Sequence, residues 1–273
     1  MNQYNSREGL GKKEALVLSE LASEGKAIFT IDDLREKCEN PANVAHNLSR
    51  KRWILHLKRG LYMIADLPYG KRGADAASPH SFVIAAHLAR YYGLERYYIG
   101  FWSALNYHGL SDQVPRTVFI VSTDWKNAVN VLNNRFEFVE VPSYKVRGLE
   151  KIEVGGENVM ISTKEKTIAD CLDRPEYCGG IDEVARALYL NRDMIDPEML
   201  KVYIKWNENN AAVKRALYIT KTLRLAEIAA VLSDMKLKSG YPLLDPTEPN
   251  KGKHSKEFGL LINKKLDPER WMF

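Results

Sequence analysis

The sequence has no long apolar run, few cysteines and no recognisable catalytic motif. No stretch of about 18 apolar residues occurs, which argues against a membrane-spanning segment. The N-terminal sequence MNQYNSREGLGKKEA has no apolar core of the kind found in signal peptides. We therefore expect a cytoplasmic protein without a membrane partner.

The cysteines are Cys38, Cys171 and Cys178, too few and the wrong number for a disulfide framework. Cys171 and Cys178 lie seven residues apart with no His or Cys pair nearby, which is poor spacing for zinc ligands. We expect free thiols in a reducing compartment and no bound metal.

Catalytic signatures are equally scarce. The sequence has no GxSxG, no P-loop and no HExxH motif, and its glycine pairs predict turns rather than phosphate-binding loops. Asp170 and Asp173 share one face of a predicted helix, as metal ligands or a carboxylate pair would. In the simpler interpretation, Asp170 lies at the helix surface near Lys166, and Asp173 closes the helix. We expect no enzymatic activity and no cofactor.

The distribution of charge is more informative than its total. A chain of 273 residues is comfortable for two domains, and 45% apolar with 27% charged residues is typical of globular proteins. The net charge of +5 equals the excess of one window, 40–65, which has no Asp or Glu. Its basic residues are Arg50, Lys51, Arg52, Lys58 and Arg59. A basic segment of this kind is typical of nucleic-acid binding.

The N-terminal 66 residues predict a winged helix-turn-helix. An amphipathic helix over 12–23 precedes Gly25, and Thr30 with Asp33 resembles a capping box that opens a second helix. Asn40-Pro41 is a strong start signal for a third helix. Apolar runs at 53–57 and 61–64 flank Lys58-Arg59-Gly60, which predicts a β-hairpin.

The third helix and the hairpin supply the candidate DNA contacts. Arg pairs bidentately with guanine and Asn with adenine in the major groove, while residues at a helix end or in a wing contact phosphates or the minor groove. The candidates on the outer helix face are Asn43, His46, Asn47, Arg50 and Lys51, and those at the helix end and wing are Arg52, Lys58 and Arg59. The alternative is a solvated surface on a winged helix that binds protein.

A Gly-, Pro- and Ala-rich stretch at 67–80 predicts a linker, and 81–273 predicts a larger mixed α/β (α+β) domain with a helical C-terminal part. Expected strands are 97–100, 117–122, 136–141, one following the Gly155-Gly156 turn to 161, and 258–262. Expected helices are 81–92, 101–108, 181–190, 211–222, 225–235, one opened by a Ser162–Glu165 capping box, and one starting at Asp196-Pro197.

Four segments resemble the AbiEi family of antitoxins from type IV abortive-infection toxin–antitoxin systems. They are RKRWILHLKRGLYMI at 50–64, FWSALNYHGLSDQVPRTVFIVST at 101–123, ISTKEKTIADCLDRPEYCGGIDEV at 161–184 and YPLLDPTEPNKGKHSKEFGLLIN at 241–263. The resemblance covers nearly the whole chain. It implies a transcriptional autorepressor that binds inverted repeats upstream of its own operon.

The resemblance also implies that the C-terminal domain counteracts a nucleotidyltransferase-like toxin, with binding to operator DNA as a dimer or cooperatively. By matching position, Arg50, Lys51, Arg52, Lys58 and Arg59 are the basic DNA contacts. Two alternatives remain open. One is a nuclease-like enzyme targeted by its winged helix, and the other is a ligand-sensing regulator without a toxin partner.

Overall fold

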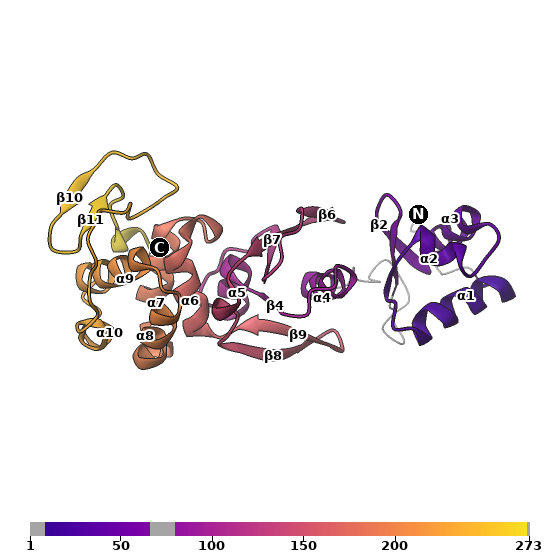
Figure 1. The fold of residues 1–273 in the computed structure, drawn as a ribbon, viewed down its shortest axis with the longest axis horizontal. Coiled ribbons are helices and arrows are strands. Elements are labelled where there is room, and N and C mark those ends of the chain that lie inside the picture. Colours follow the sequence, from indigo (N-terminus) through magenta and orange to yellow (C-terminus); the bar gives the residue numbers. More distant parts are fainter. Residues whose placement is uncertain (1–8, 66–79, 272–273) are drawn as a thin grey trace, which may run out of the picture. The chain divides into compact units, whose positions relative to one another are not determined.

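The computed structural model describes residues 9–65 and 80–271, and in these residues it is a mixed α/β protein (Figure 1). The chain divides into two compact units. The first runs to Glu95 and also takes in Ala128–Phe136 and Glu153–Val159, and the second holds the remaining residues. Of the predicted linker, 67–80, only His80 lies within the described residues, so the boundaries at 66 and 81 stay predictions.

The N-terminal part of the first unit is a winged helix-turn-helix-like fold, as predicted. Its elements are α1 (Lys12–Ser23), β1 (Ile28–Thr30), α2 (Ile31–Arg35), α3 (Pro41–Arg50), β2 (Ile54–Lys58) and β3 (Leu61–Ile64). The strands form an antiparallel sheet in the order β1-β3-β2. Phe29 on β1 and three helix leucines, Leu21, Leu34 and Leu48, are fully buried beneath this sheet and form its core.

Local signals in the sequence explain where these helices begin and end. Gly25, at φ +70°, follows α1, and its N–H donates to the carbonyl of Ala22 at 3.0 Å. Thr30 and Asp33 form the predicted reciprocal capping box of α2. Asn40 caps α3 by accepting a hydrogen bond from the Asn43 N–H at 3.2 Å. These caps satisfy helix-end groups that have no partner within the helix.

The remaining elements are α4 (Ser81–Tyr91), β4 (Tyr97–Ile99), α5 (Phe101–Tyr107), β5 (Thr117–Ser122), β6 (Val129–Val131), β7 (Asn134–Glu140), η1 (Ser143–Lys145), β8 (Leu149–Val154), β9 (Glu157–Ser162), α6 (Lys164–Asp173), η2 (Pro175–Tyr177), α7 (Ile181–Leu190), η3 (Arg192–Met194), α8 (Pro197–Trp206), α9 (Asn210–Thr222), α10 (Ala226–Leu232), β10 (Lys253–Ser255), β11 (Leu260–Ile262) and η4 (Pro268–Trp271). Six strands form one sheet in the order β6-β7-β5-β4-β9-β8. Strand β4 pairs antiparallel with β5 and parallel with β9. None of the helices in the described segments is long and apolar enough to cross a membrane.

Helix α6 lies within the main hydrophobic core of the second unit, where Ile168, Ala169 and Leu172 are fully buried. Its predicted start was wrong by one residue. Thr163, rather than Ser162, caps the helix, because the Ser162 hydroxyl instead hydrogen-bonds the Thr167 hydroxyl at 2.6 Å. The three-residue strands β6 and β10 were not predicted.

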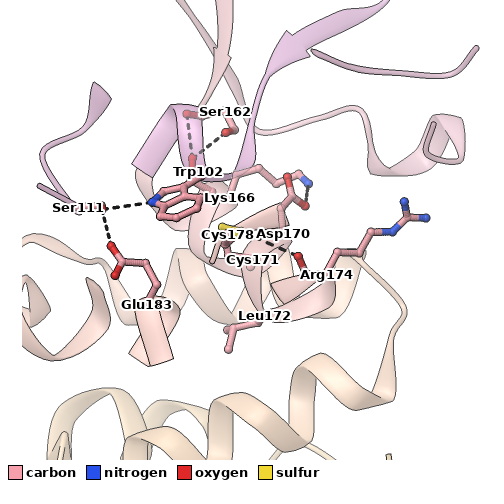
Figure 2. The surroundings of a disulfide bond; sticks show 12 residues. Trp102, Ser111, Ser162, Lys166, Asp170, Cys171, Leu172, Arg174, Cys178 and Glu183 are labelled. Carbon is pink, nitrogen blue, oxygen red and sulfur yellow. Dashed lines mark hydrogen bonds and ion pairs between the residues drawn. A yellow bond between two sulfur atoms is a disulfide. The ribbon is translucent and has the colours of Figure 1, made fainter. Parts of the chain in front are cut away.

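The expectation of free thiols was wrong for two of the three cysteines. Cys171 and Cys178 form a disulfide, with their Cα atoms 5.9 Å apart (Figure 2). Helix α6 ends at Asp173, and Arg174-Pro175 turns the chain so that Cys178 returns to the last turn of the helix. Within the described residues Cys38 is the free cysteine. Both bonded cysteines are fully buried.

Candidate nucleic-acid interface

Helix α3 presents one polar face to solvent and one apolar face to the core. Ala45 and Leu48 lie three residues apart and therefore share one face of the helix, and both are buried. Asn43, His46 and Arg50 are exposed. Asn47 lies on the same side but is half-buried. The structure therefore places the predicted base-reading side chains on one accessible surface of α3.

The wing is the β2–β3 hairpin with Arg59 and Gly60 at its turn. Gly60 has φ +75°, a conformation that side chains disfavour, and its carbonyl accepts a hydrogen bond from the Ile31 N–H at 3.1 Å. This bond fastens the wing to the start of α2. Arg59 is exposed at the turn. Lys58 lies in β2, and its side chain is outside the described part of the structure.

Arg52 occupies a position that normally favours glycine. Its φ is +64°, directly after the last turn of α3. The Arg52 N–H donates to the Ser49 carbonyl at 3.0 Å and the Trp53 N–H to the Leu48 carbonyl at 2.9 Å, a Schellman motif. An L-residue in this conformation costs roughly 1–2 kcal/mol. Despite this cost, an arginine occupies the position and places an exposed cation at the end of α3.

Lys51 differs from its basic neighbours. Its Nζ lies 2.7 Å from Glu14 Oε2, and both side chains are largely buried. The Glu14 carboxylate also accepts a hydrogen bond from the Gly11 N–H at 2.7 Å. The hydrogen bond from Lys51, followed by that from Gly11, lowers the pKa of Glu14. The pair joins the end of α3 to the start of α1.

Other carboxylates of the winged helix are also engaged by cations outside α3 and the wing. Asp33 pairs with Lys26 at 2.7 Å, Glu24 pairs with Lys37, and Asp32 pairs with Arg35. No carboxylate pairs with Arg52 or Arg59 in the parts of the chain that the structure describes. Positive charge therefore remains exposed on the end of α3 and on the wing.

Two residues of this region, Glu14 and His56, were not predicted to belong to it. Glu14 was not singled out from the sequence, because its partner Lys51 is 37 residues away. His56 was treated only as part of a strand, yet its ring lies beside Tyr62 with centroids 5.3 Å apart. The alternation of side chains along a strand was the one available signal for His56. It places His56 on the opposite face from Leu55 and Leu57, which are less exposed than His56 in the structure.

The second unit contains a polar cluster inside its core. Lys166 is fully buried and forms an ion pair with Asp170, whose other oxygen accepts the Tyr98 hydroxyl at 2.9 Å (Figure 2 draws the pair). Asn207 donates to Asp170 at 3.2 Å. Burial, followed by the Asp170 charge, raises the pKa of Tyr98 well above its usual range. The Lys166–Asp170 pairing was predicted correctly, but its placement at the helix surface was wrong, because α6 is surrounded by the core.

Asp173 lies beside this cluster and has partners of its own. Lys145 pairs with it at 2.6 Å, and the Asn209 amide donates to its other oxygen. Arg215 donates to the Asp173 carbonyl at 3.1 Å. Both aspartates of the α6 face are thus bound by cations and amides of the same unit. Among residues 9–65 and 80–271, no group of three His, Cys, Asp or Glu side chains could hold a metal ion.

A cavity of about 500 Å³ lies in the second unit between α8, the start of α9 and the segment after α10. Ile204, Val213 and Met235 supply apolar lining, and Asn209 and Asn210 supply amides. Its charged lining residues are Lys205, Glu208, Asp234, Lys236 and Lys238. This is the size of a small-molecule pocket.

Comparison with known proteins supports the architecture. No family model and no curated protein matches the sequence. This chain has a winged-helix-like part and a larger α/β part, and a solved structure has a similar fold. The crystal structure of the Rv2827c protein from Mycobacterium tuberculosis superposes with a TM-score of 0.63 at 15% sequence identity, covering 94% of this chain and 93% of that one. At this identity the likeness concerns the fold alone.

Proposed function

We propose that the protein is a sequence-specific DNA-binding transcriptional regulator that represses its own operon. One observation carries the proposal: the exposed face of α3, its end and the wing turn form a basic surface with no acidic residue in 40–65. Double-stranded DNA is the partner that such a surface fits, because a helix of this size enters the major groove while the wing reaches the adjacent backbone.

The proposed contacts divide by position. Asn43, Asn47 and Arg50 face base edges in the major groove, where amides and guanidinium groups discriminate bases. Arg52, Lys58 and Arg59 contact the backbone. Lys51 is assigned a different role, because its ion pair with Glu14 holds the ammonium group against α1. Lys51 positions α3 and contacts DNA less than its neighbours do.

The antitoxin role is the second part of the proposal. It is supported by the resemblance to AbiEi antitoxins in four segments, three of them beyond the winged helix. The larger unit then neutralises a nucleotidyltransferase-like toxin, the chain acts in the cytoplasm, and the operator contains inverted repeats bound by two copies. Because Cys171 and Cys178 form a disulfide, the cysteines no longer support a reducing compartment. The cytoplasmic assignment therefore depends on the proposed DNA partner.

We propose no catalytic role. The nuclease alternative requires Asp170 and Asp173 to reach a substrate, whereas both are buried and engaged by Lys166 and Lys145. The ligand-sensing alternative has a specific observation in its favour, the cavity beside α9 with its asparagine and lysine lining. A ligand-sensing regulator and an antitoxin share the same DNA-binding step.

Footprinting on the DNA directly upstream of the reading frame tests the DNA-binding proposal. The expected result is protection of two related half-sites, lost in an Asn43→Ala/Arg50→Ala double variant. Coexpression with the adjacent reading frame tests the antitoxin proposal: restored growth supports it. Growth arrest that the full chain fails to relieve, at confirmed expression of both proteins, would contradict the antitoxin role and leave the DNA-binding proposal standing.

A further inference from the structure

A groove runs between α3 and the wing. It has a volume of about 500 Å³, and the start of α2 closes one side. Its lining comprises Ile31 from α2, Ala42, Ala45, His46 and Ser49 from α3, and His56, Arg59, Gly60 and Tyr62 from the wing. The groove therefore lies within the proposed DNA-binding surface and has an apolar floor with polar groups around it.

Two histidines line the groove from opposite elements. His46 belongs to α3 and His56 to β2, and both are exposed. The His56 ring lies against Tyr62, and Tyr62 stacks on the buried Phe29 with centroids 5.8 Å apart. Because β-hairpin and helix are both anchored to the core, the two imidazoles are presented to the same space by rigid elements.

The charge around these imidazoles is positive or neutral. The other titratable groups that line the groove are Arg59 and Tyr62, and no carboxylate is among its described lining residues. The two carboxylates of α2 are engaged by other residues: Asp32 pairs with Arg35, and Asp33 pairs with Lys26. An anion in the groove lies beside the positive charge of Arg59. When His46 and His56 are protonated, it lies beside two further cations.

We propose that the sugar-phosphate backbone of DNA lies in this groove and that His46 and His56 are proton-dependent phosphate ligands. The inference rests on the proposed function and adds to it a chemical role for His46 and a new residue, His56. Histidine is the side chain whose charge normally changes between about pH 5 and 8. A phosphate beside each ring favours the imidazolium form, so complex formation takes up protons from the buffer.

The test measures binding of a fluorescent duplex with the upstream DNA sequence at several salt concentrations, at about pH 8 and about pH 6. Each additional neutralised phosphate makes the slope of log K against log salt steeper by about 0.9. The wild-type slope is expected to steepen by up to about 1.8 at the lower pH. The His46→Gln/His56→Gln variant keeps one slope at both pH values. Each single variant loses about half the change.

His254→Gln is the matched control, because His254 is an exposed histidine that lies outside the winged helix and packs on Tyr241. It should keep the full pH effect. Calorimetry in two buffers of different ionisation enthalpy should report proton uptake by the wild type and the control, and none by the double variant. Circular dichroism of each variant confirms folding.

The possible results distinguish failure of the histidine inference from failure of the regulator proposal. DNA binding with a pH-independent slope, or a pH effect that survives in the folded double variant, would overturn the histidine inference while leaving the regulator proposal intact. Absence of binding to the upstream duplex at either pH would overturn both. A pH effect equal on upstream and random duplexes and lost in the double variant supports the groove as a phosphate site.

Discussion

Lys51 and Glu14 are joined by an ion pair of 2.7 Å between residues 37 apart in the chain. The pair brings the C-terminal end of the candidate recognition helix to the N-terminal end of α1. From the sequence alone, Lys51 is grouped with the DNA contacts. In the structure its ammonium group is engaged by Glu14, which favours a role in holding α3 in place.

We expect Glu14→Gln to destabilise the winged helix by about 1.5–3 kcal/mol, because it removes the charge from a hydrogen-bonded ion pair whose side chains are largely shielded from water. The carboxyl pKa is lowered from 4.5 in the folded chain, so this contribution is present above 4.5 and is lost as the pH falls through the lowered pKa. Urea unfolding at neutral and acidic pH measures it. Glu39→Gln, an exposed carboxylate, is the control. Equal stability of Glu14→Gln and wild type at neutral pH would contradict the assignment.

Arg52→Gly should separate stability from binding. Glycine adopts φ +64° without strain, so the variant should gain up to about 1 kcal/mol of stability. It should also lose one phosphate contact, which makes the salt slope of DNA binding shallower by about 0.9. Thermal unfolding and fluorescence anisotropy measure the two effects.

Arg224 provides the matched control for Arg52. It follows α9 at φ +56°, is exposed, and lies in the same backbone motif, with the Leu225 N–H donating to the Thr220 carbonyl. Arg224→Gly should stabilise the protein similarly and leave DNA binding unchanged. If both variants bind DNA as the wild type does, Arg52 is not a contact.

Asp170→Asn should strongly destabilise the second unit. It leaves the Lys166 ammonium group buried without its counter-charge, a loss of about 3–5 kcal/mol. The Lys166→Met/Asp170→Leu double variant should lose less, because both charges are removed together. Denaturant unfolding tests this. A stable Asp170→Asn protein that loses a magnesium-dependent DNA cleavage shown by the wild type would instead support the nuclease alternative.

Reducing the Cys171–Cys178 disulfide should cost about 2 kcal/mol of stability, a modest value because the closed loop is short. Cys171→Ser and Cys178→Ser variants should melt earlier than the wild type under oxidising conditions, and reductant should abolish part of the difference. Cys38→Ser is the control. Mass spectrometry after alkylation of the unreduced, denatured chain should find one free thiol, and three would contradict the pairing.

Local signals account for much of what was predictable from the sequence. The caps at Thr30 and Asn40 and the glycine at 25 place the helices of the winged helix closely, because each acts over three or four residues. The helix over Ile181–Leu190 was likewise predicted at its observed bounds. Periodicity and capping therefore sufficed wherever an element is set by its own residues.

The features that were missed depend on distant partners. The Lys51–Glu14 pair spans two helices, and the return of Cys178 to α6 depends on the turn at Arg174-Pro175. The strand Val129–Val131 exists through its pairing with β7, which three residues cannot signal alone. Similarly, neither His46 nor His56 indicates a groove by itself, because the shared space arises only when the hairpin packs beside α3.

The central claim is that α3 and the wing bind DNA sequence-specifically. The most direct measurement is the affinity of wild type, Arg50→Ala and Arg59→Ala for the upstream duplex in the presence of random competitor, with Lys253→Ala, an exposed lysine of β10, as control. We predict that Arg50→Ala weakens binding by about 1–3 kcal/mol with reduced sequence preference, that Arg59→Ala makes the salt slope shallower by about 1, and that the control binds normally. Wild-type affinity and salt slope in both folded variants would contradict the claim.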